Sequence, residues 1–244
     1  MTDTAQQSPG SNKEAEAEER RTFLERAVRR GYMAWNALNE IVLGVETEYS
    51  VSGVGARMPG IQGVETDRSR YRDNVRYAPL DYVRLRRMMD LLAPGVDDVF
   101  YDLGSGRGRI LCTAARHRMK RVVGIELFEE LCVSARENAA RVRGRQTPVD
   151  VICADVVTVD YSDGTIFTLH LPFGEATTRA VLQVIRDSLR TNPRNIRIGY
   201  AHPLYEYVFA EASWLEKYAS FRPTDATNKN FWRSVSFWRN KSAL

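Results

Sequence analysis

The chain has 244 residues, of which 43% are hydrophobic, and this is enough for one large domain with a full core. No run approaches the roughly 20 consecutive apolar residues of a membrane-spanning helix. The segment from Met1 to Arg21 holds no apolar stretch typical of a secretory signal. The formal net charge of +4 is too small to indicate nucleic acid as a partner. These features predict a cytoplasmic protein without membrane contact, and we do not expect a nucleic-acid ligand.

The three cysteines, Cys112, Cys132 and Cys153, all lie in apolar stretches. None of them belongs to a Cys-x-x-Cys pair or to the Cys/His spacing of a structural zinc site. Free cysteines in apolar surroundings usually behave as small buried residues. We therefore expect three buried thiols without chemistry and no bound metal.

The N-terminal part of the chain predicts a tail followed by a helical segment. Residues 1–20 are polar and acidic and predict a disordered tail. Apolar residues recur at helical spacing over residues 21–43, and the Gly-rich stretch 44–64 is typical of a loop or lid. A further helix is expected from Asp81 to Leu92. Residues 21–94 are therefore interpreted as an N-terminal helical and lid segment.

Over residues 95–244, apolar strand-like runs alternate with helical patterns. Such alternation predicts a parallel sheet with helices on both faces. The expected strands are Val99–Tyr101, Arg121–Glu126, Val149–Cys153, Gly164–Leu171, Asn195–Tyr200 and Ser234–Trp238. The expected helices are Arg107–His117, Phe128–Val142, Glu175–Leu189 and Leu204–Tyr218.

A glycine-rich loop, Asp102 to Arg109, lies between a predicted strand and a predicted helix. In open α/β sheets, ligands bind beyond the carboxyl ends of the strands, where this loop must lie. Its glycines, at positions 104, 106 and 108, allow a tight turn and a close approach of a ligand to the backbone. The third glycine comes one residue too early for the G-x-G-x-x-G dinucleotide pattern, and no G-x-x-x-x-G-K-[ST] phosphate loop exists. A nicotinamide-dependent oxidoreductase is therefore a weaker alternative.

The run FYDLGSGRGR, from Phe100 to Arg109, resembles motif I of class I S-adenosylmethionine-dependent methyltransferases. The resemblance extends over residues 95–200 and includes Gly124-Ile125-Glu126 and Ala154-Asp155. It implies S-adenosyl-L-methionine as the cofactor and a Rossmann-like domain over residues 95–244. We expect a doubly wound α/β fold, with a mostly parallel seven-stranded sheet, a terminal antiparallel strand and an N-terminal helical extension.

The same resemblance implies roles for single residues. In that family the glycine loop packs against the methionine part of the cofactor, and the residue at Asp102 orients the loop or meets the cofactor's amino group. The residue at Glu126 accepts hydrogen bonds from both ribose hydroxyls, and the residue at Asp155 meets the adenine amino group. The implied cofactor-binding residues are Asp102, Gly104, Ser105, Gly106, Glu126, Leu127 and Asp155.

Glu126 fits its implied role on physical grounds as well, because it ends an apolar strand shortly after the glycine loop. A carboxylate that accepts two hydroxyl donors gains charge-assisted hydrogen bonds of about 1.5–3 kcal/mol each. Structural alternatives remain for both acids. Glu126 could cap the helix that starts near Phe128, and Asp155 could be an ordinary turn residue.

The acceptor side is expected beyond the fourth strand, where the chain reads TLHLPFG from Thr168 to Gly174. This resembles the [D/N]-P-P-[F/Y] loop of amino-group methyltransferases, with His170 in place of its first residue. In that family the loop holds the target amine and the aromatic ring stacks over it, which implies Pro172 and Phe173 as substrate-binding residues. An imidazole can act as a base near neutral pH, so His170 is the candidate catalytic residue. The alternative is a packed histidine that only lines the pocket or ends the strand.

Residues 63–82 are dense in tyrosine, arginine and aspartate. Related methyltransferases place a segment before motif I across the cofactor, which implies Tyr77 as a cofactor residue and Tyr71 as a substrate residue. A structural loop at the sheet edge is the alternative. The aromatic pairs Phe231-Trp232 and Phe237-Trp238 are expected in the core and in an edge strand rather than in a base-stacking platform.

We therefore predict an S-adenosylmethionine-dependent methyltransferase whose acceptor is a nitrogen or oxygen of a small molecule or protein side chain. The chain resembles both DOT1-like protein-lysine methyltransferases and bacterial small-molecule methyltransferases, but it lacks the Asn-rich strand-four motif of the DOT1-like enzymes. A non-catalytic S-adenosylmethionine-binding partner or sensor is a further alternative. Such a protein would keep the glycine loop and Glu126 without an acceptor pocket.

Overall fold

The structure, a computed structural model, describes residues 26–27, 30–47, 79–221 and 234–241. The predicted tail, most of the Gly-rich stretch 44–64 and the candidates Tyr71 and Tyr77 lie outside the described residues, as do Phe231 and Trp232. Within the described ranges, no helix is both long enough and apolar enough to span a bilayer.

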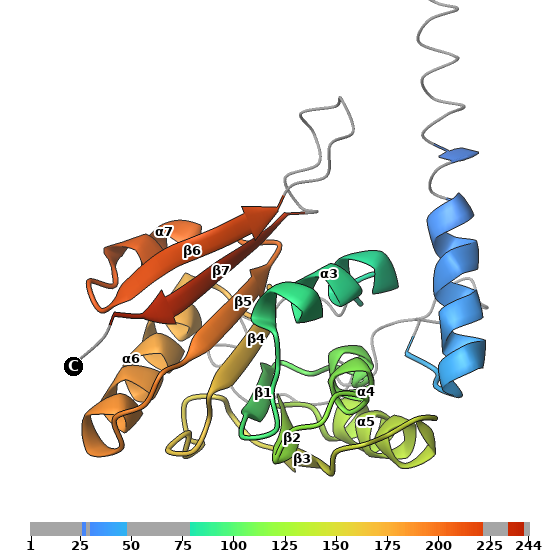
Figure 1. Ribbon diagram of the computed structural model, residues 1–244, viewed down its shortest axis with the longest axis horizontal. Helices are drawn as coiled ribbons and strands as arrows, with labels where there is room; N and C mark the ends of the chain where they lie inside the picture. The colour runs from blue at the N-terminus through green and yellow to red at the C-terminus, as the bar shows by residue number, and fades with distance from the viewer. Residues whose placement is uncertain (1–25, 28–29, 48–78, 222–233, 242–244) are drawn as a thin grey trace, which may run out of the picture.

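Seven strands form one sheet in the order β3-β2-β1-β4-β5-β7-β6 (Figure 1). Strands β1 to β5 run parallel, and β7 runs antiparallel to both of its neighbours, β5 and β6. The expected doubly wound, mostly parallel sheet with a C-terminal antiparallel strand is thus confirmed. The strands are β1 (Val99–Leu103), β2 (Arg121–Glu126), β3 (Val149–Cys153), β4 (Ile166–His170), β5 (Arg197–Ala201), β6 (Leu215–Phe221) and β7 (Val235–Asn240).

Helices cover both faces of this sheet (Figure 1). One buried cluster contains side chains of α3, α4 and α5, and the other contains side chains of α6 and α7. The helices are α3 (Tyr82–Leu92), α4 (Arg109–Ala114), α5 (Glu129–Arg141), α6 (Glu175–Thr191) and α7 (Glu206–Glu211). Residues 30–43 form a further helix, as the spacing of their apolar residues predicts.

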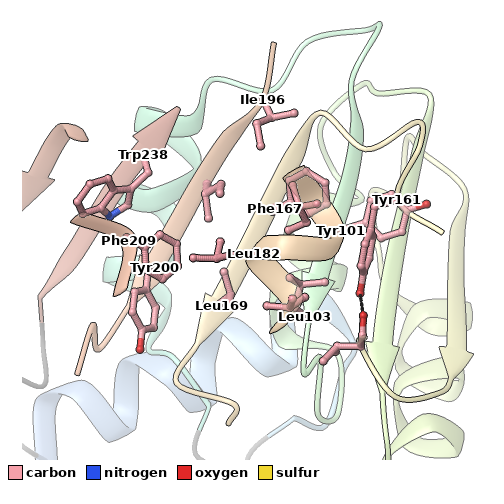
Figure 2. Packing of buried hydrophobic residues seen from close by; sticks show 14 of the residues in the cluster. Tyr101, Leu103, Tyr161, Phe167, Leu169, Leu182, Ile196, Tyr200, Phe209 and Trp238 are labelled. Atoms are coloured by element: carbon pink, nitrogen blue, oxygen red, sulfur yellow. Dashed lines mark hydrogen bonds between the residues drawn. The ribbon is translucent and has the colours of Figure 1, made fainter. Parts of the chain in front are cut away.

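Strand β1 packs on both faces, because successive side chains of a strand point to opposite sides of the sheet. Tyr101 and Leu103 belong to the cluster beneath α6 and α7, whereas Phe100 belongs to the cluster beneath α3 and α4. Figure 2 shows the first cluster, in which the rings of Tyr101 and Phe167 stack with centroids 5.7 Å apart. All five residues of β1 are buried, so Asp102 is an ionisable side chain inside a covered strand.

The predicted helix over Leu204–Tyr218 is wrong in its second half. Helix α7 ends at Glu211, and the chain then enters strand β6 at Leu215. Strand β6 lies at the sheet edge. Its two consecutive charged residues, Glu216 and Lys217, interrupt the alternation of apolar and polar residues that normally indicates a strand. Pairing with β7, which comes later in the chain, makes this segment a strand. The predicted helix Arg107–His117 is also shorter than expected, since α4 covers only Arg109–Ala114.

The expectation of three buried cysteines is wrong for Cys153. Cys112 and Cys132 are buried, but Cys153 is exposed. Cys153 ends β3, which is the edge strand on the other side of the sheet, and an edge strand has a neighbour on one side only. By contrast, Phe237 and Trp238 are buried in the core, as expected.

The segment that follows helix 30–43 docks onto the domain through Arg109, which is only 2% exposed. The guanidinium of Arg109 donates to Thr47 Oγ1 at 2.6 Å, to the Leu80 carbonyl at 3.1 Å and to Glu40 Oε1 at 3.2 Å. It also lies over the ring of Tyr82, 4.7 Å from the centroid. One buried cation at the start of α4 therefore joins three separate parts of the chain.

Asn138 on α5 makes a second connection beside it. Its Oδ1 accepts from the Glu46 N–H at 2.8 Å, and its Nδ2 donates to the carbonyls of Glu46 and Arg107 at 3.1 and 2.9 Å. Asn138 is fully buried, so each of these partners replaces water that its amide would otherwise bind. The N-terminal segment is thus tied to Arg107, a residue of the glycine loop.

The Arg109→Met variant should lower the free energy of unfolding by about 3 kcal/mol, because removing one partner of a buried ion pair leaves the other charge unpaired. The remaining charge is Glu40, whose side chain is 12% exposed. Urea denaturation of the full chain measures this change. In the control variant Arg190→Met, which breaks an exposed pair with Asp187, the change should stay below about 0.5 kcal/mol. Equal losses in the two variants would contradict a stabilising role for the buried pair.

Candidate functional site

The glycine loop lies at the carboxyl end of β1, between β1 and α4. Its three glycines adopt the left-handed region, with φ values of +79° at Gly104, +54° at Gly106 and +83° at Gly108. A Cβ atom at Gly104 would lie 2.1 Å from the Cβ of Pro172, so no other residue fits there without a shift of the backbone. The loop after β1 and the loop after β4 are therefore in direct contact.

Glu126 ends β2 and points toward the glycine loop. Its Oε2 accepts from the Gly106 N–H at 2.8 Å, and its Oε1 accepts from the N–H groups of Leu127 and Phe128 at 2.9 and 3.1 Å. Burial raises the pKa of the Glu126 carboxyl, and these three N–H donors oppose that rise. The carboxylate is thus fixed beside the glycine loop rather than directed into bulk water.

Asp102 is the buried acid at the end of β1, with 1% of its surface exposed. Its Oδ1 accepts from Thr168 Oγ1 at 2.8 Å, whereas Oδ2 is buried and has no hydrogen-bond partner. Burial raises the pKa of Asp102 to about 7; Thr168 lowers it, and the nearby charge of Glu126 raises it further. The Ser105 hydroxyl, three residues further along the chain, is also buried without a partner. Buried polar atoms without partners are rare in proteins, and two of them in one loop indicate a place for a ligand.

The loop after β4 begins with His170, the last residue of that strand. His170 and Pro172 are half-buried, whereas Phe173 is 4% exposed and belongs to the core cluster beneath α6. Leu171 has a φ of +42°, and His202, which follows β5, has a φ of +52°. Such values are uncommon for residues other than glycine and concentrate at functional sites. Two neighbouring strands therefore end in strained backbone at the same sheet edge.

Asp155 and Leu127 lie at the ends of the neighbouring strands. Asp155 is half-buried, and its Oδ1 accepts from the Val157 N–H at 3.1 Å, as a turn residue commonly does. Leu127 is half-buried and follows Glu126 directly. Tyr71 and Tyr77 fall in the part of the chain that the structure leaves undescribed.

Sequence reasoning missed Thr168 as a residue of this site. Thr168 sits in the middle of β4 with no exposed surface and pairs in register with Asp102 of β1. A threonine in an apolar strand gives no sign of a polar partner, because β-branched residues are common in strands. The signal would have been the side-by-side register of β1 and β4, which the sequence does not state.

The geometry brings two carboxylates, Asp102 and Glu126, to one glycine-lined loop at the carboxyl edge of a parallel sheet. The Glu126 carboxylate accepts hydrogen bonds from backbone N–H groups. In Asp102, the Oδ2 atom is buried and has no hydrogen-bond donor. Such an arrangement can bind a ligand that carries hydroxyl and ammonium donors, and the contact with Pro172 places a second loop against it.

Comparison with known proteins agrees with this geometry. The family model described as Histone methylation protein DOT1 matches residues 70–157. A protein-lysine N-methyltransferase of Saccharolobus islandicus is 35% identical over 104 residues, which are 41% of this chain and 63% of that protein. The chain therefore spans less than two thirds of the length of this relative.

Among solved structures, the chain is similar to an RNA methyltransferase from Salinibacter ruber in complex with S-adenosyl-L-homocysteine. The TM-score is 0.48 with 25% identity, over 68% of this chain and 96% of the other. A TehB-like SAM-dependent methyltransferase from Corynebacterium glutamicum matches with a TM-score of 0.47 and 18% identity, over 66% and 89% of the two chains. The glycine loop and its acid stand on a sheet of order β3-β2-β1-β4-β5-β7-β6, and over the matched residues the chain is similar to methyltransferases.

Proposed function

We propose that the protein is an enzyme that transfers a methyl group from S-adenosylmethionine to a nitrogen or oxygen acceptor. The observation that carries this proposal is the Glu126 carboxylate held 2.8 Å from the Gly106 N–H, at the tip of the strand beside the glycine loop. A carboxylate in this place suits a ribose with two neighbouring hydroxyl donors. The expected cytoplasmic location is part of the same proposal.

The residues at the loop fit the parts of S-adenosylmethionine. Glu126 would hold the ribose, Asp155 and Leu127 would lie along the adenine, and Gly104 and Gly106 would leave room for the methionine chain. Asp102 Oδ2 and Ser105 Oγ are the buried atoms that still need partners. When bound, this cofactor supplies an electrophilic methyl group. Tyr77 is proposed as a further contact on the basis of the family resemblance alone.

Asp102 suits the ammonium group of the cofactor. Its Oδ2 is buried without a donor, and an ammonium is a donor that also carries the opposite charge. Because burial raises the pKa of Asp102 to about 7, the carboxyl is partly protonated at neutral pH before a cation arrives. Binding of the ammonium would then favour the ionised form and release a proton.

The acceptor is proposed to lie against the loop from His170 to Phe173. Phe173 anchors this loop in the core, while His170 and Pro172 are half-buried at the sheet edge next to Gly104. An imidazole nitrogen of His170 would take the proton of the attacking group as the methyl bond forms. The name of the matched relative makes a lysine amine of a protein the first acceptor to test, and Tyr71 is a further proposed contact.

Glu126→Gln should weaken binding of S-adenosylhomocysteine by about 10- to 100-fold, because each lost charge-assisted hydrogen bond is worth about 1.5–3 kcal/mol. Isothermal titration calorimetry measures the affinity. The matched control is Glu137→Gln, an exposed glutamate on α5, which should bind as the parent does. Unchanged affinity in the folded Glu126→Gln variant would contradict the proposed cofactor site.

The activity itself is tested by measuring S-adenosylhomocysteine production with protein extract, lysine-containing peptides, small amines and RNA as separate acceptors. Turnover with one class that is lost in Glu126→Gln supports the enzyme. Tight cofactor binding without turnover on any of the four would favour the non-catalytic binding protein instead. Turnover on RNA would overturn the expectation of a small-molecule or protein acceptor.

Asp102 predicts a pH dependence of cofactor affinity. The free protein holds a proton on Asp102 below its pKa of about 7, and that proton must leave before the carboxylate meets the ammonium. Affinity for S-adenosylhomocysteine should therefore fall as the pH drops from 7.5 to 5.5, by up to about tenfold per pH unit below 7. The Asp102→Asn variant should bind more weakly at pH 7.5 and show a flatter profile. Parallel profiles in the two proteins would exclude Asp102 as the titrating group.

His170→Ala should lower kcat by about 100-fold or more, because a positioned base contributes about 10²–10⁴-fold to such reactions. The affinity for S-adenosylhomocysteine should stay within twofold, since the cofactor residues are untouched. Steady-state kinetics across pH 6–9 with the acceptor found above measure both quantities. A changed KM with an unchanged kcat would show that His170 only lines the acceptor pocket.

A further inference from the structure

Outside the proposed cofactor contacts, the described residues contain one further cluster of side chains with metal-ligand chemistry. It consists of Glu129, Cys132 and Cys153, whose ligand atoms all lie within 4.8 Å of one another. We propose that these three residues bind a thiophilic divalent cation of the Zn²⁺ class. The site adjoins the segment Glu126–Phe128 and can modulate the affinity of the cofactor site.

The fold brings the three ligands together from two elements. Glu129 and Cys132 are three residues apart near the start of α5, so they lie on one face of that helix. Cys153 ends β3 and pairs in register with Glu126 at the end of β2. The Cys153 sulfur lies within 4.8 Å of both a Glu129 carboxylate oxygen and the Cys132 sulfur. Three donors therefore converge although Cys132 and Cys153 are far apart in the sequence.

The donor set suits zinc better than calcium or magnesium. Two thiolates are soft ligands, whereas calcium and magnesium prefer oxygen ligands only. In a tetrahedral zinc site with Zn–S bonds of about 2.3 Å, neighbouring ligand atoms lie about 3.5–3.8 Å apart. The three ligand atoms are now up to 4.8 Å apart, so small side-chain rotations bring them to the distances of a zinc site. Glu129 and Cys153 are exposed, so an ion can enter, and water can take the fourth position.

Binding changes the protonation of the two thiols in a defined way. Each thiol loses one proton as its sulfur–metal bond forms, and the Glu129 carboxylate donates a lone pair without losing a proton. Each bound divalent ion should therefore release up to two protons. The cluster then has a net charge of −1, because three negative ligands surround a +2 ion.

Arg136 opposes occupation of the site. Its Nη1 lies 3.0 Å from Glu129 Oε1, and its Nη2 donates to the Val151 carbonyl at 3.2 Å. A cation must displace this guanidinium from the carboxylate before Glu129 can act as a ligand. Removing the charge at position 136 should therefore strengthen metal binding.

The two sulfurs also contact the segment that carries Glu126. The Cys132 thiol donates to the Glu126 carbonyl at 3.4 Å, and the Cys153 thiol donates to the Leu127 carbonyl at 3.7 Å. Loss of both protons on metal binding removes both donors from this segment. Metal occupancy and cofactor affinity should then be linked, each changing the other by the same factor. This linkage rests on the proposed cofactor site, whereas the metal site itself does not.

The test is a Co²⁺ titration of the full chain, reduced with a phosphine and stripped of metal. We expect thiolate-to-cobalt absorption in the near ultraviolet, visible bands of tetrahedral cobalt, a stoichiometry of one, and displacement by Zn²⁺. Cys132→Ser and Cys153→Ser should each lose the thiolate absorption or weaken binding at least tenfold. Cys112→Ala, which changes the cysteine outside the cluster, should leave the titration unchanged. Circular dichroism shows whether each variant is folded.

Two further variants test the assigned roles. Glu129→Gln should weaken Co²⁺ binding about tenfold, and Arg136→Gln should strengthen it, since this change frees the carboxylate. A parent chain without thiolate absorption at millimolar Co²⁺ would overturn the site. Absorption that persists in both serine variants would do the same, and so would a Cys132–Cys153 disulfide that forms in air while the reduced chain ignores metal.

A separate experiment tests the linkage by measuring the affinity for S-adenosylhomocysteine with and without saturating Zn²⁺. We expect a change of at least fivefold, at the lower end of usual couplings between sites, and the same factor for Zn²⁺ affinity when the ligand is present. Equal affinities would overturn the linkage while leaving the metal site in place. Cobalt binding without any S-adenosylhomocysteine binding would instead overturn the proposed function and leave the metal site standing.

Discussion

The hydrogen bond from the Gly106 N–H to Glu126 Oε2 joins the glycine loop after β1 to the tip of β2, and the site is arranged around it. Only left-handed backbone at the glycines lets the loop turn back far enough to present that N–H. The carboxylate accepts two further N–H groups from its own segment, so its position is set before any ligand binds. A site built this way loses little conformational entropy on binding, which is the physical basis of preorganisation.

Polar groups placed inside the domain hold the remaining parts in position. Arg109 ties residues 40–47 and 80–82 to the first turn of α4, and Asn138 ties Glu46 to the glycine loop. Most of the donors on these side chains are used, whereas Asp102 Oδ2 and Ser105 Oγ remain without partners. The contrast separates them from Arg109 and Asn138, because buried polar groups that are fully hydrogen-bonded stabilise a fold, whereas unpartnered ones cost free energy.

The elements with one clear pattern were predictable from the sequence. Strand β2 matches its expected range and α5 differs by one residue at each end, because a buried parallel strand and an amphipathic helix carry strong local patterns. The edge strand β3 also matches its expected range, although none of its residues is buried. Strand β6 was not predictable, since its exposed edge carries Glu216 and Lys217 and its pairing partner comes later in the chain. The exposure of Cys153 likewise follows from the position of β3 at the sheet edge, which local composition does not encode.

The sequence by itself determined the strand–loop–helix unit around Gly104 and Gly106 and the acid at the end of the next strand, because glycine spacing and strand ends are local properties. The tertiary structure alone decided which side chains meet there. Thr168 reaches Asp102 through strand register, Phe173 turns into the core, and Cys153 comes beside Cys132 through the packing of α5 on the sheet edge. Contacts between distant segments depend on register and helix placement, and these are set by the packing of the whole core.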